Sequence, residues 1–322
     1  MNVRLCLHVC LVLGIVVTAA RADDRALIIG IGQGYPSPNN LEGPARDVEL
    51  AATLAHQLGY TGSQVKILRE AEATKAAIIA ALQWLNAGIT AHDRRFLYYS
   101  GHGFRVPTSH GGCMAALVPV DARSRETFLL ADEFNQYLQG LRQRAKVVML
   151  IDACFSGGIT KQISGLREDR AKYYEDKSGP TCDKPTNLKS LSVVEDTPAA
   201  GGQDQLVAMM ATGDNEVAFG ARRGSGTGSV FTQCLYDLVM GDGERGLSLP
   251  FTTLREQTAS CIKKVSEQSD LLLYTSQLRG NPVLFQQNLR FASISPAPSD
   301  PTGGITGARN VAELFDRLIN NS

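Results

Sequence analysis

Short apolar runs alternate with amphipathic stretches from residue 25 onward, and this alternation limits the folds open to the chain. Continuous apolar runs of four to seven residues are typical of strands buried on both faces of a parallel sheet. Amphipathic stretches between such runs are typical of helices that cover the sheet. The sequence therefore predicts an α/β fold, a three-layer sandwich with a mostly parallel central sheet.

The predicted elements follow from the positions of these runs and of the residues that cap or stop helices. Thr74 is suited to cap a helix, and Gly59 and Gly88 are suited to end one. The predicted strands are 26–31, 65–68, 95–100, 146–151 and 205–211, with a small side hairpin at 117–121 and a last apolar run at 282–285. The predicted helices are 45–58, 75–87, 131–141, 229–240 and 252–267.

Residues 1–22 have the pattern of a secretory signal peptide. A positive start at Arg4 is followed by the apolar run 5–17 and by small residues at Ala20 and Ala22. The mature protein is therefore expected to begin near Asp23 and to be secreted or periplasmic. No other stretch approaches the roughly 20 apolar residues of a membrane span, so none is expected.

The composition is that of a globular protein, with 43% hydrophobic residues and 32 basic against 32 acidic side chains. Balanced charge gives no argument for a nucleic-acid partner. Five of the seven cysteines lie beyond the signal segment, and an odd number in an exported protein leaves at least one thiol unpaired. Cys182, in a polar stretch, is the predicted exposed spare thiol. No CxxC spacing indicates a zinc or redox site.

Three short motifs could carry chemistry, and the first is glycine-rich. Gly30, Gly32 and Gly34 follow the first predicted strand. A dinucleotide fingerprint needs its third glycine one position later, where this chain has Tyr35, and a helix directly after it. Pro36 instead favours an extended loop. A glycine-rich turn is therefore the favoured interpretation.

The second motif places His102 between two glycines just beyond the strand 95–100. The carboxyl ends of parallel strands are where open α/β sheets carry their sites. The small neighbours leave an imidazole accessible, which favours a working histidine. The alternative is an ordinary surface or core histidine, as His56, His92 and His110 are expected to be.

The third motif places Cys154 just beyond the strand 146–151 and before small residues. A thiol there can face a cleft while neighbouring N–H groups stabilise an oxyanion. The alternative is a buried cysteine that acts as a small apolar side chain. If the two strands are neighbours, Cys154 and His102 share one crevice. A nucleophilic thiol and an imidazole base then predict acyl transfer through a thioester, which requires no cofactor.

These two motifs, S-G-H-G and D-A-C-F-S-G-G, resemble the catalytic motifs of the caspase-like cysteine peptidases (peptidase C14) of the bacterial metacaspase type. His102 and Cys154 lie 52 residues apart, and in caspases the histidine lies about 50 residues upstream of the cysteine. Further similarity lies at 41–47, 117–121 and 229–232. The resemblance implies a caspase–haemoglobinase fold and cysteine endopeptidase activity.

The resemblance also implies roles for individual residues. Gly103 and Cys154 would supply the oxyanion N–H groups, while Asp152 and Asp214 would bind substrate in the primary specificity pocket. Two carboxylates attract a guanidinium or ammonium group, so cleavage after Arg or Lys is expected. Alternatively, Asp152 caps the turn and Asp214 lies on a solvated loop.

The chain departs from the family pattern at two points. Phe155 replaces a common second histidine. The segment 104–120, where many metacaspases bind activating calcium, contains no Asp or Glu. Calcium needs several oxygen ligands, so calcium dependence is in doubt and neither a metal nor another cofactor is expected.

The same resemblance divides the chain. After the signal peptide (1–22) come a large-subunit-like part (23–159), a linker (160–204), a small-subunit-like part (205–288) and a Ser/Pro/Gly-rich tail with a short amphipathic helix (289–322). The linker offers several basic residues at which the enzyme could cleave itself. They are Lys161, Arg167, Arg170, Lys172, Lys177, Lys184 and Lys189.

Two other functions remain open at the level of sequence. The chain could be a catalytically inactive caspase-like scaffold that binds a partner, or a Cys–His hydrolase that acts on other amides. The peptidase is favoured because both His102 and Cys154 are present. Its expected partners are protein or peptide substrates with a basic residue before the cleaved bond.

Overall fold

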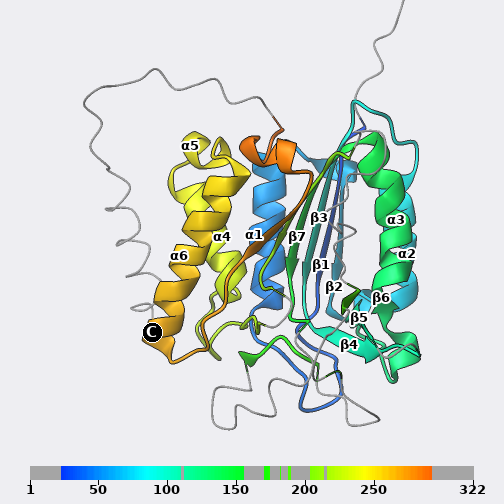
Figure 1. The fold of residues 1–322 in the computed structure, drawn as a ribbon, viewed down its shortest axis with the longest axis vertical. Coiled ribbons are helices and arrows are strands. Elements are labelled where there is room, and N and C mark those ends of the chain that lie inside the picture. The colour runs from blue at the N-terminus through cyan, green and yellow to red at the C-terminus, as the bar shows by residue number, and fades with distance from the viewer. Residues whose placement is uncertain are drawn as a thin grey trace, which may run out of the picture.

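The computed structural model describes residues 23–109, 112–155, 170–174, 182, 188–189, 204–213 and 216–291. Its centre is a six-stranded sheet with the strand order β10-β9-β7-β3-β1-β2 (Figure 1). The strands are β1 (Arg25–Gly30), β2 (Val65–Arg69), β3 (Arg94–Ser100), β7 (Lys146–Asp152), β9 (Leu206–Met210) and β10 (Gln277–Gly280). All neighbours are parallel except β10, which runs antiparallel to β9. The predicted mostly parallel sheet is confirmed.

Helices cover both faces of the sheet and complete three layers (Figure 1). One face carries α1 (Pro44–Gln57), α4 (Val230–Gly241) and α6 (Phe251–Ser269), with the short α5 (Glu244–Leu247) beside α4. The other face carries α2 (Lys75–Asn86) and α3 (Ala131–Arg144). The predicted helices match these within three residues at each end. Short 3-10 helices occupy Gly62–Gln64, Glu70–Glu72, Arg125–Thr127 and Pro282–Gln286, the last replacing the predicted final apolar run.

Alternate side chains of each strand enter two different cores. In β3, Phe96 and Tyr98 pack into the core beneath α1, α4 and α6, whereas Leu97 and Tyr99 pack into the core beneath α2 and α3. All four are at most 1% exposed. Burial on both faces explains why the strand sequences show no polar alternation.

Local sequence sets where the helices begin. The Thr74 hydroxyl accepts a hydrogen bond from the Ala77 N–H, so Thr74 caps α2 as predicted. Pro44 begins α1, at a position where its missing N–H has no helical partner to lose.

A second, smaller sheet lies beside the first. It contains β4 (Gly103–Pro107), β5 (Cys113–Leu117), β6 (Leu129–Leu130) and β8 (Leu188–Lys189). The predicted hairpin at 117–121 is misplaced, because β4 and β5 form the antiparallel pair earlier in the chain. β4 begins one residue after His102, so the second sheet follows closely after the end of β3 in the chain.

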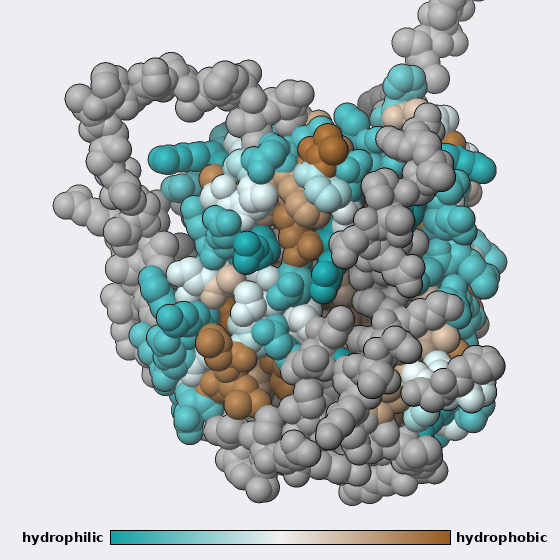
Figure 2. Space-filling view, viewed as in Figure 1, coloured by the Kyte–Doolittle hydropathy of each residue, from teal (hydrophilic) through white to brown (hydrophobic). Residues whose placement is uncertain are grey.

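The described surface is mainly hydrophilic on the face in Figure 2, with separate hydrophobic patches. Among the described large apolar side chains, Leu273 and Val283 are the exposed ones. None of the helices formed by described residues has the length and apolarity needed to cross a bilayer. The predicted signal peptide and residues 292–322 of the predicted C-terminal tail lie outside the described residues, whereas Leu289 and Phe291, at the start of that tail, are buried.

Candidate active site

His102 and Cys154 follow two adjacent strands of the sheet. β3 and β7 pair in parallel with Ser100 opposite Asp152, and each of the two residues comes two positions after that pair. The two residues therefore follow adjacent strands at one edge of the sheet, as the sequence predicts. This arrangement arises because parallel strands in register end at the same edge.

The Cys154 thiol is fully buried and bonded to the backbone of Ala218. Its sulfur accepts a hydrogen bond from the Ala218 N–H at 2.8 Å, and the thiol donates to the Ala218 carbonyl at 3.1 Å. Burial raises the pKa of the thiol to about 12. The thiol is therefore neutral in this arrangement, and no hydrogen bond joins it to the His102 ring.

The His102 imidazole makes a close hydrogen bond to the backbone of Asn39. Its Nε2 lies 2.5 Å from the carbonyl oxygen of Asn39, which can only accept, so Nε2 carries the proton. Nδ1 is buried without a hydrogen-bond partner. Burial lowers the pKa of the imidazole to about 4, although the Asn39 and Lys172 backbones act in the opposite direction. The ring is therefore a neutral base whose free lone pair is on Nδ1.

The two predicted oxyanion donors point at the same oxygen atom. The Gly103 and Cys154 N–H groups donate to the carbonyl oxygen of Lys172 at 3.2 and 3.4 Å. Lys172 belongs to the predicted linker, 18 residues after the cysteine. A peptide carbonyl of the chain itself therefore occupies the position expected for a substrate carbonyl.

The backbone around Lys172 is extended between two parts of the protein. On one side, the Lys172 N–H donates to the Ala218 carbonyl at 2.9 Å and the Gly220 N–H donates to the Arg170 carbonyl at 2.6 Å. On the other side, the Tyr174 N–H donates to the Gly103 carbonyl at 3.3 Å. Residues 170–174, which we call the inserted segment, are thus bound through two isolated bridges, Ala171 with Phe219 and Tyr173 with Gly103.

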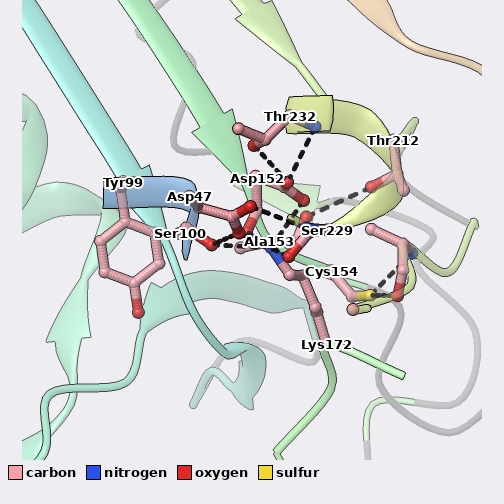
Figure 3. Close-up of polar contacts among 12 residues, drawn as sticks. Asp47, Tyr99, Ser100, Asp152, Ala153, Cys154, Lys172, Thr212, Ser229 and Thr232 are labelled. Carbon is pink, nitrogen blue, oxygen red and sulfur yellow. Dashed lines mark hydrogen bonds and ion pairs between the residues drawn. The ribbon is translucent and has the colours of Figure 1, made fainter. Parts of the chain in front are cut away.

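The side chain of Lys172 enters a buried acidic pocket (Figure 3). Its Nζ lies 2.9 Å from Asp152 Oδ1, 3.4 Å from Asp47 Oδ2 and 2.8 Å from Ser100 Oγ. It also donates to the Asp152 carbonyl at 3.1 Å. The ammonium group therefore has oxygen partners for all of its protons and two carboxylates for its charge.

Both carboxylates are fixed by neighbours other than Lys172 (Figure 3). Asp152 accepts hydrogen bonds from the Thr232 N–H at 3.3 Å and the Thr232 hydroxyl at 2.7 Å. Asp47 accepts from the Ser229 N–H at 2.7 Å and the Ser100 hydroxyl at 2.6 Å. Burial raises the pKa of Asp47, with Lys172 opposing and Asp152 reinforcing the shift. The pocket is preorganised for a cation.

The predicted pocket residues compare with the structure in three ways. Asp152 lines the pocket, and its side chain does not cap a turn. Asp214 lies outside the described residues. Asp47, which the sequence analysis did not single out, supplies a second carboxylate. An aspartate on the apolar face of a predicted helix could have indicated this role. Its partners Ser100 and Ser229 are 53 and 182 residues away in sequence, so no local pattern shows the contact.

The structure corrects the expected openness of the crevice. His102 is 1% exposed and Cys154 is 0% exposed. The inserted segment contributes to this cover, since its backbone lies on Gly103 and Cys154 and the Tyr174 ring packs edge-on against His102. The two groups share one site, but that site is filled.

The structure also corrects the predicted spare thiol. Cys182 is 6% exposed and forms a disulfide with Cys113. Cys234 and Cys261 form a second disulfide between α4 and α6. Among the described cysteines Cys154 is the free one, which is the state a nucleophile requires.

The glycine-rich turn after β1 binds a side chain of the protein itself. The Gly32 and Gln33 N–H groups donate to the Glu70 carboxylate at 2.9 and 2.6 Å. These are the donors that a phosphate would need. The prediction of a turn in place of a nucleotide site is consistent with this arrangement.

No group of three or more His, Cys, Asp or Glu side chains is gathered to hold a metal ion within the part of the chain that the structure describes. The described residues of the segment 104–120 contain no Asp or Glu side chain that could bind calcium.

The parallel sheet, the Cys–His pair at its rim, the two N–H donors on one carbonyl and the acidic pocket define the architecture of a cysteine peptidase. The chain belongs to the caspase domain family (peptidase C14), whose sequence profile matches residues 23–291. This confirms the resemblance found in the motifs.

Curated relatives agree with this assignment, and a solved structure shares the fold. The chain is 33% identical to Metacaspase-1B of Aspergillus fumigatus over 151 residues, 44% of this chain and 37% of the relative. It is 30% identical to Metacaspase-1 of Eremothecium gossypii over 207 residues, 55% and 45% of the two chains. These matches span less than half the length of the relatives. The crystal structure of protein GSU0716 from Geobacter sulfurreducens shares the fold, with a TM-score of 0.61 and 17% sequence identity. The match covers 84% of this chain and 99% of that structure.

Proposed function

We propose that this protein is an exported cysteine endopeptidase that cleaves after Lys or Arg and that processes itself at the Lys172–Tyr173 bond. One observation carries the proposal: the Lys172 carbonyl lies on the Gly103 and Cys154 N–H groups while its ammonium group lies between Asp47 and Asp152. A peptide bound in this way has its carbonyl carbon beside the nucleophile and its charge in the pocket. Asp214 is retained as a further pocket acid by its resemblance to the family motif.

The proposed acylation begins when the Cys154 thiol leaves its hydrogen bonds to Ala218. His102 Nδ1 accepts the thiol proton, and the sulfur forms a bond to the Lys172 carbonyl carbon. The oxyanion is stabilised by the two N–H groups. When the carbonyl reforms, the C–N bond breaks, His102 protonates the leaving amine of Tyr173, and a thioester remains.

In the proposed deacylation, His102 takes a proton from water, and the hydroxide attacks the thioester carbon. The C–S bond breaks, and the proton returns from His102 to the Cys154 sulfur. The products are a Lys172 carboxylate and a new amino terminus at Tyr173. In later cycles the basic residue of another substrate replaces Lys172 in the pocket. No cofactor takes part, and equal rates in EGTA and in calcium would support calcium independence.

The test is turnover of peptides that differ only in the residue before the cleaved bond. We expect cleavage after Lys and Arg and at least about 100-fold less after Asp, because Asp47 and Asp152 repel a third carboxylate. Cys154→Ala is the blank. An absence of thiol-dependent turnover would instead support the binding scaffold. Turnover of other amides without preference for a basic residue would support the general Cys–His hydrolase.

The proposal of export rests on the signal-like residues 1–22 and on the two disulfides. Structural disulfides are typical of secreted and periplasmic proteins. The mature mass of protein recovered from the periplasm or medium tests this proposal, with a start near Asp23 expected and a full-length cytoplasmic product contradicting it.

A further inference from the structure

The two residues that follow Lys172 lie in an aromatic environment. The Tyr173 ring stacks on Phe104, with centroids 5.8 Å apart and planes at 17°. The Tyr174 ring is 7% exposed and meets the rings of Tyr35, His102 and Phe128 edge-on at 5.9, 5.7 and 5.6 Å. This is a formed pocket with an aromatic occupant already in it.

The backbone fixes which substrate positions reach this pocket. Tyr173 pairs with Gly103 in a parallel bridge, and the Tyr174 N–H donates to the Gly103 carbonyl. The N–H of the same glycine donates to the Lys172 carbonyl. One residue therefore sets the register between the bond to be cleaved and the side chains after it. Tyr173 and Tyr174 are the first and second residues after that bond.

The walls of the pocket favour an aromatic guest. Phe104 and Phe128 are 1% exposed and contact each other edge-on at 5.2 Å. Tyr35 is held in place by a hydrogen bond from its hydroxyl to the Val118 carbonyl at 2.8 Å. Aromatic walls stabilise a bound aromatic ring, because the ring buries a large apolar area and makes edge-to-face contacts with them.

We propose that this pocket, formed by Tyr35, His102, Phe104 and Phe128, selects substrates with an aromatic residue at the second position after the cleaved bond. The inference deepens the proposed peptidase function and rests on it. An aromatic guest also covers the His102 ring, which excludes water from the base during acylation. The substrate class is thus a basic residue followed, two positions later, by Tyr, Phe or Trp.

The experiment uses quenched fluorescent peptides with Ala-Ala-Lys before the bond and Tyr-Tyr, Tyr-Ala, Ala-Tyr or Ala-Ala after it. The purified processed enzyme is assayed in dithiothreitol. We expect Tyr at the second position to raise kcat/KM about 10- to 100-fold over Ala, with a smaller effect at the first position. Replacing that Tyr by Phe should keep most of the gain.

A variant locates the effect in the pocket. In Phe128→Leu the preference for Tyr over Ala at the second position should fall to less than a third of its wild-type value. Phe134→Leu removes an equally buried phenylalanine in α3 and should keep the preference. A ratio of two substrates measured on one preparation does not depend on the fraction of folded enzyme.

The outcomes separate the two claims. Equal rates for the Tyr and Ala peptides, or an unchanged preference in Phe128→Leu, would overturn the aromatic pocket and leave the peptidase standing. Absence of cleavage of every peptide would overturn the peptidase and this inference with it.

Discussion

Lys172, Asp47 and Asp152 are three charged side chains with 0% exposure at the rim of the sheet. Charges taken out of water are tolerated when they are paired and hydrogen-bonded, and losing one partner is costly. Here the cation belongs to the inserted segment, whereas both carboxylates are held by Ser100, Ser229 and Thr232. The proposed specificity follows from this difference, because the carboxylates stay in place to bind another basic side chain when Lys172 leaves.

The first prediction concerns these carboxylates. Asp47→Asn and Asp152→Asn should each lower kcat/KM for a peptide with Lys before the bond by about 10²- to 10³-fold, because removing one partner of a buried charged pair costs roughly 3–5 kcal/mol. Glu49→Gln, an exposed change on the same helix, is the control and should keep the wild-type rate. Wild-type kinetics in Asp47→Asn would remove Asp47 from the pocket.

The second prediction concerns the pH dependence of stability. Because the pKa of His102 is about 4 in the folded protein against 6.5 for a free imidazole, the unfolded chain takes up the proton first as the pH falls. Stability is therefore lost between about pH 6.5 and pH 4. In a Cys154→Ala background, the free energy of unfolding should fall by about 3 kcal/mol more in the His102 protein than in His102→Gln between pH 7 and pH 4. If denaturant titrations show that the free energies of unfolding of the two proteins fall equally between pH 7 and pH 4, the burial of a neutral imidazole is contradicted.

At the scale of elements, the apolar strands were predictable because strands buried on both faces consist of nearly continuous apolar residues. β10 was missed, since an antiparallel edge strand of sequence QLRG lacks that pattern. The inserted segment was missed because its extended form depends on pairing with Gly103 and with residues 218–220, which are distant in sequence. One local signal existed: Tyr173 and Tyr174 are the only aromatic residues between 160 and 204.

The same reasoning applies to the site. The positions of His102 and Cys154 just beyond two strands were predictable, because each follows an apolar run, whereas the pairing of β3 with β7 came from the structure. The acidic pocket was only half predictable, because Asp47 joins Asp152 through contacts from three separate elements. That the site is covered by the chain itself could not be read from any local pattern.

The third prediction concerns the junction between β3 and β4. A Cβ on Gly103 would lie 2.1 Å from the Cys154 carbonyl oxygen and 2.8 Å from a ring carbon of Phe155. Gly103→Ala must therefore push the two loops apart and displace an oxyanion donor. Peptide turnover should fall at least about 100-fold. Gly88→Asn, at a position with a positive φ and open space, should keep normal turnover, and normal turnover in Gly103→Ala would contradict the proposed donor.

At the scale of the whole molecule, the structure represents a closed state. The inserted segment contributes a carbonyl, a cation and two aromatic rings to one site, and the nucleophile beneath it is neutral. The Cys113–Cys182 disulfide joins β5 to the chain eight residues after Tyr174. The proposed cut lies between these two cysteines in sequence, so cleavage alone does not separate the parts.

The fourth prediction follows from that disulfide. After self-cleavage the wild-type protein should run as one species in non-reducing electrophoresis and as two fragments after reduction. Cys113→Ser should give two fragments without reductant. The gels are denaturing, so that non-covalent association does not hold the fragments together. The Cys234–Cys261 disulfide is the internal control, since both of its cysteines lie on the same side of the cut. Separation of wild-type fragments without reductant would contradict the tether.

The central claim is that Lys172 is bound as the enzyme's own first substrate, and mass spectrometry tests it most directly. Reduced wild type and Cys154→Ala are purified side by side, together with Lys172→Gln and the linker control Lys177→Gln. We expect a fragment beginning at Tyr173 in wild type and in Lys177→Gln, and intact chains in Cys154→Ala and Lys172→Gln. An intact wild type, or cleavage that persists unchanged in Lys172→Gln, would contradict it.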